Sequence, residues 1–141
     1  MKLFYNKLIL EHKVAEVKRI QAMCFKTCSK CGFVWPERAS FLSDPDLRMI
    51  GYQVHFDELM AGLFLFDHVC GTALAILAED FQDLYDGPIF TERLDGTKEC
   101  EGYCLHKNDL RPCPAKCECA YVRKIMQVIL SWPKQELAVK R

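Results

Sequence analysis

The chain has 141 residues and a formal net charge of zero, and half of its residues are hydrophobic. This length and composition allow one buried core and exclude a largely disordered chain. Its nine cysteines cannot all pair within one chain, and in a reducing compartment they indicate metal or redox chemistry rather than disulfides.

The first residues lack the long apolar region and the small-residue cleavage site of a secretory signal. The longest apolar run falls far short of the about 20 residues that a transmembrane helix needs. We therefore expect a cytoplasmic protein with no membrane partner.

Charge is distributed unevenly along the chain. Residues 1–34 carry a net charge of +5, residues 37–101 carry −10, and residues 102–141 carry +5. Basic terminal segments that pack around an acidic middle, within one chain or in a homo-oligomer, account for this pattern. Nucleic-acid binding is disfavoured, because no dense basic cluster is interleaved with aromatic residues.

The N-terminal segment, residues 1–25, is predicted to contain an amphipathic helix over residues 3–23. Leu10, Val14 and Val17 repeat at helical spacing, with charged residues between them. Such a stripe packs on its own domain more often than it forms a coiled-coil dimer, since it lasts fewer than four heptads.

A cysteine motif follows, in which Cys28 and Cys31 are separated by two residues and Gly32 comes next. This is the pattern of a zinc knuckle, where glycine permits the tight turn behind two thiolates. With Cys24 included, the spacing also matches that of radical-SAM iron–sulfur enzymes, but the chain is too short for their barrel. Cys24 is therefore kept as a reserve ligand.

The middle of the chain predicts a small antiparallel sheet with strands at about residues 51–57, 62–67 and 72–78, after a short helix and turn at 37–50. The last two strands form a hydrophobic hairpin with His68, Cys70 and Gly71 at its tip. Zinc prefers four tetrahedral nitrogen and sulfur ligands, so we predict one zinc ion held by Cys28, Cys31, His68 and Cys70. Asp67 competes with His68 for the fourth position, and a histidine in such a turn is often only hydrogen-bonded.

A second cysteine group lies between residues 100 and 119. Its five members are Cys100, Cys104, Cys113, Cys117 and Cys119. We expect the first four to bind a second metal centre, with Cys119 as a substitute or neighbour. The spacing suits either an irregular zinc site or a [4Fe–4S] cluster. The last two cysteines are predicted to begin a helix that ends before Pro133 and presents Arg123 and Lys124 as a basic surface.

These elements predict an α+β fold. A zinc-ribbon-like core at residues 26–95 is expected between the N-terminal helix and a segment, residues 96–141, that holds the second cysteine group and the C-terminal helix. We expect all three parts to form one unit.

The chain resembles an uncharacterised family of small cysteine-rich bacterial proteins found mainly in anaerobes. The resemblance rests on the strings CSKCGFVWP, IGYQVHF, GLFLFDHVCGT and GYCLH followed by CPAKCEC, and covers roughly residues 28–125. It excludes the N-terminal helix and Cys24. It implies a bacterial source and an anaerobic setting in which a labile cluster would survive, and no activity.

Three classes of function remain open. The first is a metal-binding regulatory, sensing or interaction module whose partner is a protein or a second copy of the chain. The second is an iron–sulfur electron carrier of anaerobic redox metabolism. The third is an enzyme, which we do not expect, because no cysteine–histidine pair, carboxylate pair or phosphate loop has the context that its chemistry requires.

Overall fold

The computed structural model describes residues 24–136, so the helix predicted over residues 3–23 lies outside the described residues. Two antiparallel sheets and a few helices make up the fold, which confirms the α+β prediction. In chain order the elements are β1 (Lys26–Thr27), β2 (Val34–Trp35), α2 (Arg38–Leu42), β3 (Leu47–Gln53), η1 (Leu59–Ala61), β4 (Leu63–His68), β5 (Ala73–Leu77), η2 (Ala78–Leu84), η3 (Tyr103–Leu105) and α3 (Ala120–Leu130).

The larger sheet has the order β3-β4-β5, with β4 in the middle. Successive side chains of a strand point to opposite faces, and along β4 the buried positions are Phe64, Phe66 and His68. The hairpin of β4 and β5 agrees with prediction to within one or two residues. The first predicted strand was placed too late: β3 ends at Gln53, opposite Leu63, and the chain then turns through η1 to enter β4.

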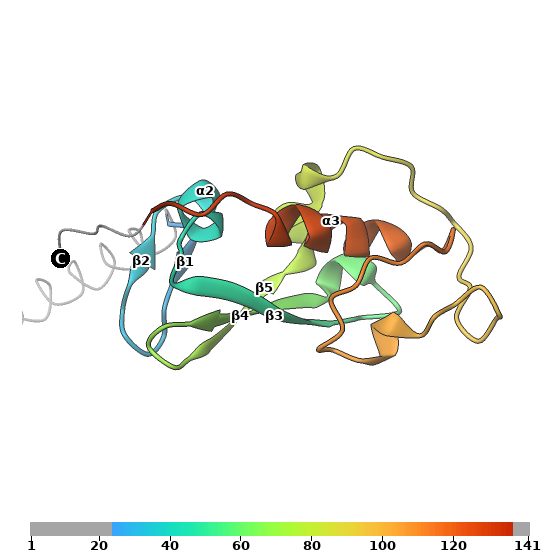
Figure 1. The fold of residues 1–141 in the computed structure, drawn as a ribbon, viewed down its shortest axis with the longest axis horizontal. Helices are drawn as coiled ribbons and strands as arrows, with labels where there is room; N and C mark the ends of the chain where they lie inside the picture. The colour runs from blue at the N-terminus through green and yellow to red at the C-terminus, as the bar shows by residue number, and fades with distance from the viewer. Residues whose placement is uncertain (1–23, 137–141) are drawn as a thin grey trace, which may run out of the picture.

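One hydrophobic core lies on a single face of this sheet. Figure 1 shows α2 and α3 on that side of the three strands. Helix α3 buries Val122, Ile125, Met126 and Ile129 there, at most 4 % exposed. The core therefore joins the central sheet to the segment that follows the second cysteine group.

Two predicted helices take a different form. The helix expected to begin at Cys117 begins at Ala120, because the N–H of Glu118 donates to the carbonyl of Glu92 at 2.8 Å and holds the preceding residues against another segment. Phe81 and Leu84 repeat at the spacing of a short helix, and this segment forms the 3-10 helix η2, which begins directly after β5.

The second cysteine group is attached to the edge of the sheet at β3. The N–H of Tyr52 donates to the carbonyl of Lys107 at 2.7 Å. A Cβ atom on the preceding residue, Gly51, would lie 2.8 Å from that same carbonyl oxygen. This contact therefore needs glycine for close approach, and the ladder between β3 and β4 is irregular at the same place, between Met49 and Gly51.

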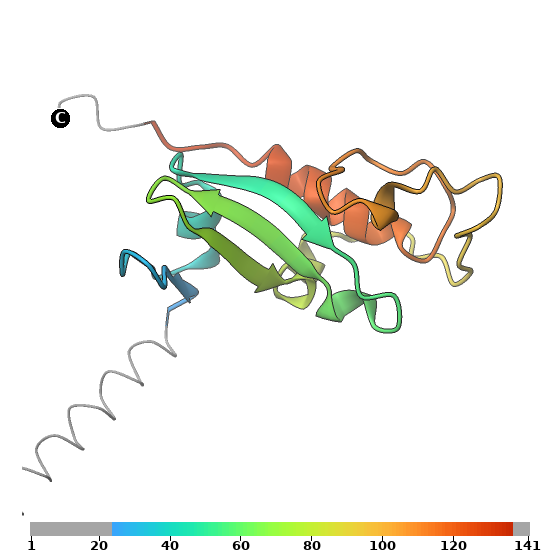
Figure 2. The ribbon, with the colours of Figure 1, turned by 90° about the horizontal axis from the view of Figure 1, so that it is seen from below.

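The two cysteine groups lie at opposite ends of the long axis. Strands β1 and β2 are at one end in Figure 1, and the orange segment before α3 is at the other. Figure 2 shows the same separation from below, with the sheet between the two ends. Between residues 24 and 136, no helix is long and apolar enough to cross a bilayer.

Candidate metal centres

The first half of the candidate metal site is the turn between β1 and β2. The N–H of Gly32 donates to the carbonyl of Cys28 at 2.9 Å, and the N–H of Cys28 donates to the carbonyl of Phe33 at 2.8 Å. Gly32 has a φ of +78°, a conformation that other residues rarely adopt. This turn brings the thiols of Cys28 and Cys31 to one side of the hairpin.

The second half is the turn between β4 and β5. The N–H of Gly71 donates to the carbonyl of His68 at 2.8 Å, and the N–H of His68 donates to the carbonyl of Thr72 at 2.9 Å. Gly71 has a φ of +94°, so glycine permits this turn as well. His68 and Cys70 thereby approach the first turn from the end of the sheet.

The four predicted ligands converge. Ligand atoms of Cys28, Cys31, His68 and Cys70 all lie within 4.8 Å of one another. The Sγ atoms of Cys28 and Cys70 are 3.6 Å apart, and Nδ1 of His68 lies 3.1 Å from Cys70 Sγ and 3.8 Å from Cys31 Sγ. Two thiolates on one tetrahedral zinc ion lie about 3.8 Å apart, given zinc–sulfur bonds of about 2.3 Å. This Cys3His cluster therefore has the dimensions of a site for a single metal ion.

Strand geometry explains why His68, and not Asp67, joins the three cysteines of this cluster. Neighbouring residues of a strand face opposite ways, and Asp67 lies 3.7 Å from the exposed Arg48 on β3, while His68 is buried. The reserve ligand Cys24 is not part of the cluster, and its Sγ lies 3.3 Å from the hydroxyl of Thr27.

Local groups set the ionisation of the Cys3His cluster. The backbone N–H of Cys31, with that of Lys30, lowers the pKa of the Cys28 thiol to about 6 despite the opposing effect of desolvation. Desolvation raises the pKa of Cys70. The ring of His68 stands edge-on to Trp35, with centroids 5.1 Å apart, and the indole N–H of Trp35 donates to Asp44 at 2.7 Å. The imidazole is thus held in place by packing on a hydrogen-bonded neighbour.

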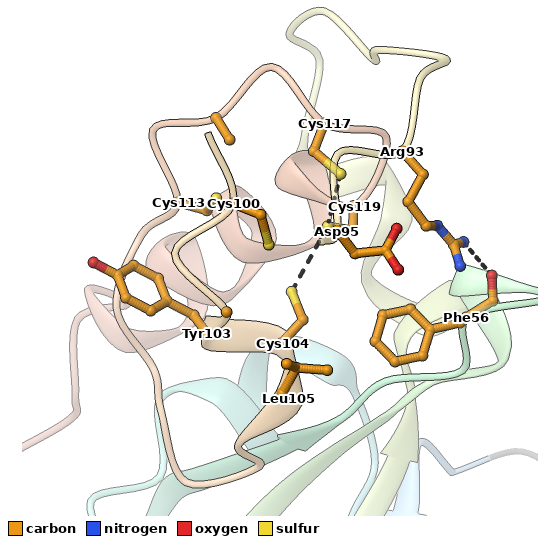
Figure 3. Close-up of a pocket in the computed structure, with 12 residues that line it drawn as sticks. Phe56, Arg93, Asp95, Cys100, Tyr103, Cys104, Leu105, Cys113, Cys117 and Cys119 are labelled. Atoms are coloured by element: carbon orange, nitrogen blue, oxygen red, sulfur yellow. Dashed lines mark hydrogen bonds between the residues drawn. The ribbon is translucent and has the colours of Figure 1, made fainter. Parts of the chain in front are cut away.

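The second cysteine group surrounds one pocket, shown in Figure 3. All five of its cysteines line this five-cysteine pocket, as do Phe56, Arg93, Asp95 and Tyr103. Cys119 Sγ lies 3.3 Å from Cys117 Sγ and 3.7 Å from Cys104 Sγ. Of all the residues from 24 to 136, however, the Cys3His cluster is the one set of three or more mutually close ligand atoms, so these three sulfurs are more widely spread.

Two N–H groups donate to sulfurs of the pocket. The backbone N–H of Leu94 donates to Cys117 Sγ at 3.2 Å, and the guanidinium of Arg123 donates to Cys104 Sγ at 3.7 Å. The hydrogen bond between Cys104 and Cys119 is the main reason that the pKa of Cys104 falls to about 6, and the nearby Arg123 adds to this lowering. The same bond and burial raise the pKa of Cys119 strongly, and burial raises that of Cys113.

Arg123 lies in the interior of the protein, whereas the sequence analysis predicted it on the surface of the C-terminal helix. It is fully buried, so the predicted basic surface on α3 is wrong for Arg123, although Lys124 is exposed. Arg123 Nε donates to the carbonyl of Arg111 at 2.7 Å, another guanidinium N–H donates to the carbonyl of Asp109, and the guanidinium carbon lies 5.6 Å from the ring centroid of Tyr103. The sequence analysis did not predict that Arg123 is buried and Lys124 exposed, because two adjacent basic residues on a helix are both expected to face solvent.

The chain was compared with protein-family models, curated proteins and solved structures. None of the three comparisons finds a match. The geometry of the two cysteine groups therefore carries the functional interpretation.

Proposed function

We propose that this protein is a metal-dependent binding and sensing module of the bacterial cytoplasm, with zinc in the Cys3His cluster. One observation supports it above all: four ligands from two turns, 37 to 42 residues apart in the chain, lie at the spacing of a tetrahedral ion. Three thiolates and one imidazole are a common ligand set of structural zinc, and all four positions are supplied by the protein. The pair of knuckles on antiparallel hairpins gives this end a zinc-ribbon-like arrangement.

Zinc would supply much of the stability of this end. Strands β1 and β2 have two residues each, too few for an independent hairpin. A metal that links this turn to the turn after β4 would hold the hairpin on the sheet, and its binding free energy would contribute directly to folding. Loss of the metal should therefore release residues 24–36.

The binding surface we propose surrounds these knuckles. Phe33 on the first turn and Val34 at the start of β2 are 50 % and 47 % exposed, and Val69 on the second turn is 71 % exposed. An apolar surface made by both turns exists only while the turns are held together, so its partner, a protein or a second copy of this chain, would bind in a metal-dependent way. Neither a nucleic acid nor a membrane is part of this proposal.

A second metal centre in the five-cysteine pocket would give the module its second metal-dependent element. The segment before α3 is fixed to the helix by side chains, among them Gln127, whose amide donates to the carbonyl of Leu110 at 2.7 Å. Metal loss or oxidation there should loosen this segment and the start of α3. An iron–sulfur electron carrier is the second candidate function, favoured by five cysteines around a single pocket.

Hydrogen exchange on the full chain tests the sensing proposal. With metal present, the backbone amides of residues 24–36 and 100–130 should be protected, and chelation or oxidation should increase exchange in both. Sedimentation under the same two conditions tests the binding surface, because self-association or complex formation should require the metal. Equal protection of these amides in the two states would contradict the proposal. Cys24→Ser is the matched control, because Cys24 lies outside the Cys3His cluster and its substitution should leave the metal content full.

A further inference from the structure

The two close sulfur–sulfur contacts in the five-cysteine pocket share one residue. Cys119 is 3.3 Å from Cys117 and 3.7 Å from Cys104. Among the described residues these three do not form a set of mutually close ligand atoms, so the sulfurs of Cys104 and Cys117 are farther from each other than either is from Cys119. Figure 3 shows the corresponding chain of contacts from Cys104 through Cys119 to Cys117.

One zinc ion does not fit this arrangement. A tetrahedral ion needs four ligand atoms that are all close to one another, as they are in the Cys3His cluster at the other end of the molecule. The sulfurs of the pocket are spread around its walls instead. A centre with several metal ions separates its terminal thiolates, since metal and sulfide ions lie between them.

The contacts also distinguish between two kinds of iron–sulfur cluster. In a [2Fe–2S] cluster each iron takes two cysteines, so the thiolates must form two separate close pairs. The sulfur–sulfur contacts of 3.3 and 3.7 Å both contain Cys119, so these two contacts do not supply a separate pair of thiolates for each of two irons. Without Cys119, the other four cysteines remain around the pocket as one thiolate for each iron of a [4Fe–4S] cluster.

We infer that Cys100, Cys104, Cys113 and Cys117 hold one [4Fe–4S] cluster in the five-cysteine pocket, and that Cys119 stays unligated as a thiol that contacts two of the cluster's ligands. This assignment rests on the second metal centre of the proposed function and goes beyond it by naming the cluster, its ligands and the place of the fifth cysteine.

The surroundings of the pocket suit a cluster with net negative charge. Arg123, which is fully buried, directs a guanidinium N–H at Cys104 Sγ, and the N–H of Leu94 is directed at Cys117 Sγ. Hydrogen bonds and positive charge near the ligand sulfurs stabilise the more reduced, more negative state of a cluster. The cluster would therefore accept one electron from an external one-electron carrier more readily than it would without Arg123.

The test begins with the full chain, purified without oxygen and reconstituted with ferrous iron and sulfide. We expect about four irons and four acid-labile sulfides per chain, a broad absorption band near about 400 nm, and the electron paramagnetic signal of a [4Fe–4S]⁺ cluster after reduction with dithionite. About two irons with a [2Fe–2S] signal, or two zinc ions and no iron, would overturn the inference while leaving a second metal centre in place. No metal beyond the Cys3His cluster would overturn both the inference and the proposed second centre.

Matched variants test the ligand assignment. Cys104→Ser should lose most of the iron and the absorption band, whereas Cys119→Ser should keep both. Loss of iron in Cys119→Ser, with retention in Cys100→Ser, would make Cys119 a ligand and overturn the assignment. Circular dichroism and the zinc content of each variant show whether it is folded, and the spectrum of the unsubstituted chain decides the cluster type without any variant.

Discussion

The two cysteine groups differ in how their ligands are brought together. In the Cys3His cluster, two short turns with glycine supply two ligands each, and a small number of residues determine the geometry. In the five-cysteine pocket, the thiols come from a 20-residue segment with little regular structure, whose position depends on contacts with β3 and α3. The comparison teaches that two local turns can bring four candidate ligands together, whereas the positions of the dispersed cysteines depend on the rest of the fold.

The largest effect should come from breaking the compact site. Cys28→Ser should remove zinc and lower the free energy of unfolding by roughly 3 kcal/mol or more, because binding free energy at a structural site is folding free energy. Zinc content and thermal unfolding measure this, with Cys24→Ser as the control that should resemble the unsubstituted chain. Unchanged metal content and melting temperature in Cys28→Ser would show that this ligand assignment is wrong.

Arg123→Met should break the dispersed site and leave the compact one intact. Arg123 is buried and donates to the carbonyl groups of Arg111 and Asp109, so its loss should cost about 2–4 kcal/mol through unpaired buried acceptors. Hydrogen exchange should rise over residues 103–113, with no change over 24–36. Lys124→Met, at the exposed neighbouring position, is the control, and equal effects of the two substitutions would contradict the buried role.

Gly51→Ala should loosen the attachment of the second group to the sheet. The added methyl would lie 2.8 Å from the carbonyl oxygen of Lys107, and overpacking of this kind costs about 1–3 kcal/mol. We expect a lower melting temperature and faster exchange of the Tyr52 amide. Ala75→Ser, on the exposed face of β5, should be close to neutral. Unchanged stability of Gly51→Ala would contradict this prediction, since it would mean that the segment around Lys107 can move away from β3 at no cost in free energy.

The smallest effect on stability should come from Val69→Ser. Val69 is 71 % exposed, so the change in unfolding free energy should stay within about 0.5 kcal/mol. The same substitution should weaken metal-dependent association, measured by sedimentation, because it removes an apolar side chain from the proposed surface. Val34→Ser should act in the same way. Unchanged association in both variants would show that these two turns are not part of the interface.

The sequence by itself determined the local chemistry of the compact site. The two-residue spacing of Cys28 and Cys31 and the glycine after each knuckle are properties of short turns, and the apolar runs on either side of His68 and Cys70 mark a hairpin. Because these signals act over a few residues, the four members of the Cys3His cluster and the last two strands could be predicted. The start of β3 could not, because buried Leu47 and Met49 are recognisable only once β4 lies beside them.

Only the tertiary structure decided how the second group is arranged. Cysteine spacing indicated a centre between residues 100 and 119, but spacing does not say which sulfurs meet, and Cys119 proved to lie between Cys104 and Cys117. The burial of Arg123 and the contact between Gly51 and Lys107 likewise join residues 12 to 56 positions apart. Such contacts are set by packing of the whole chain, and no local pattern of residues encodes them.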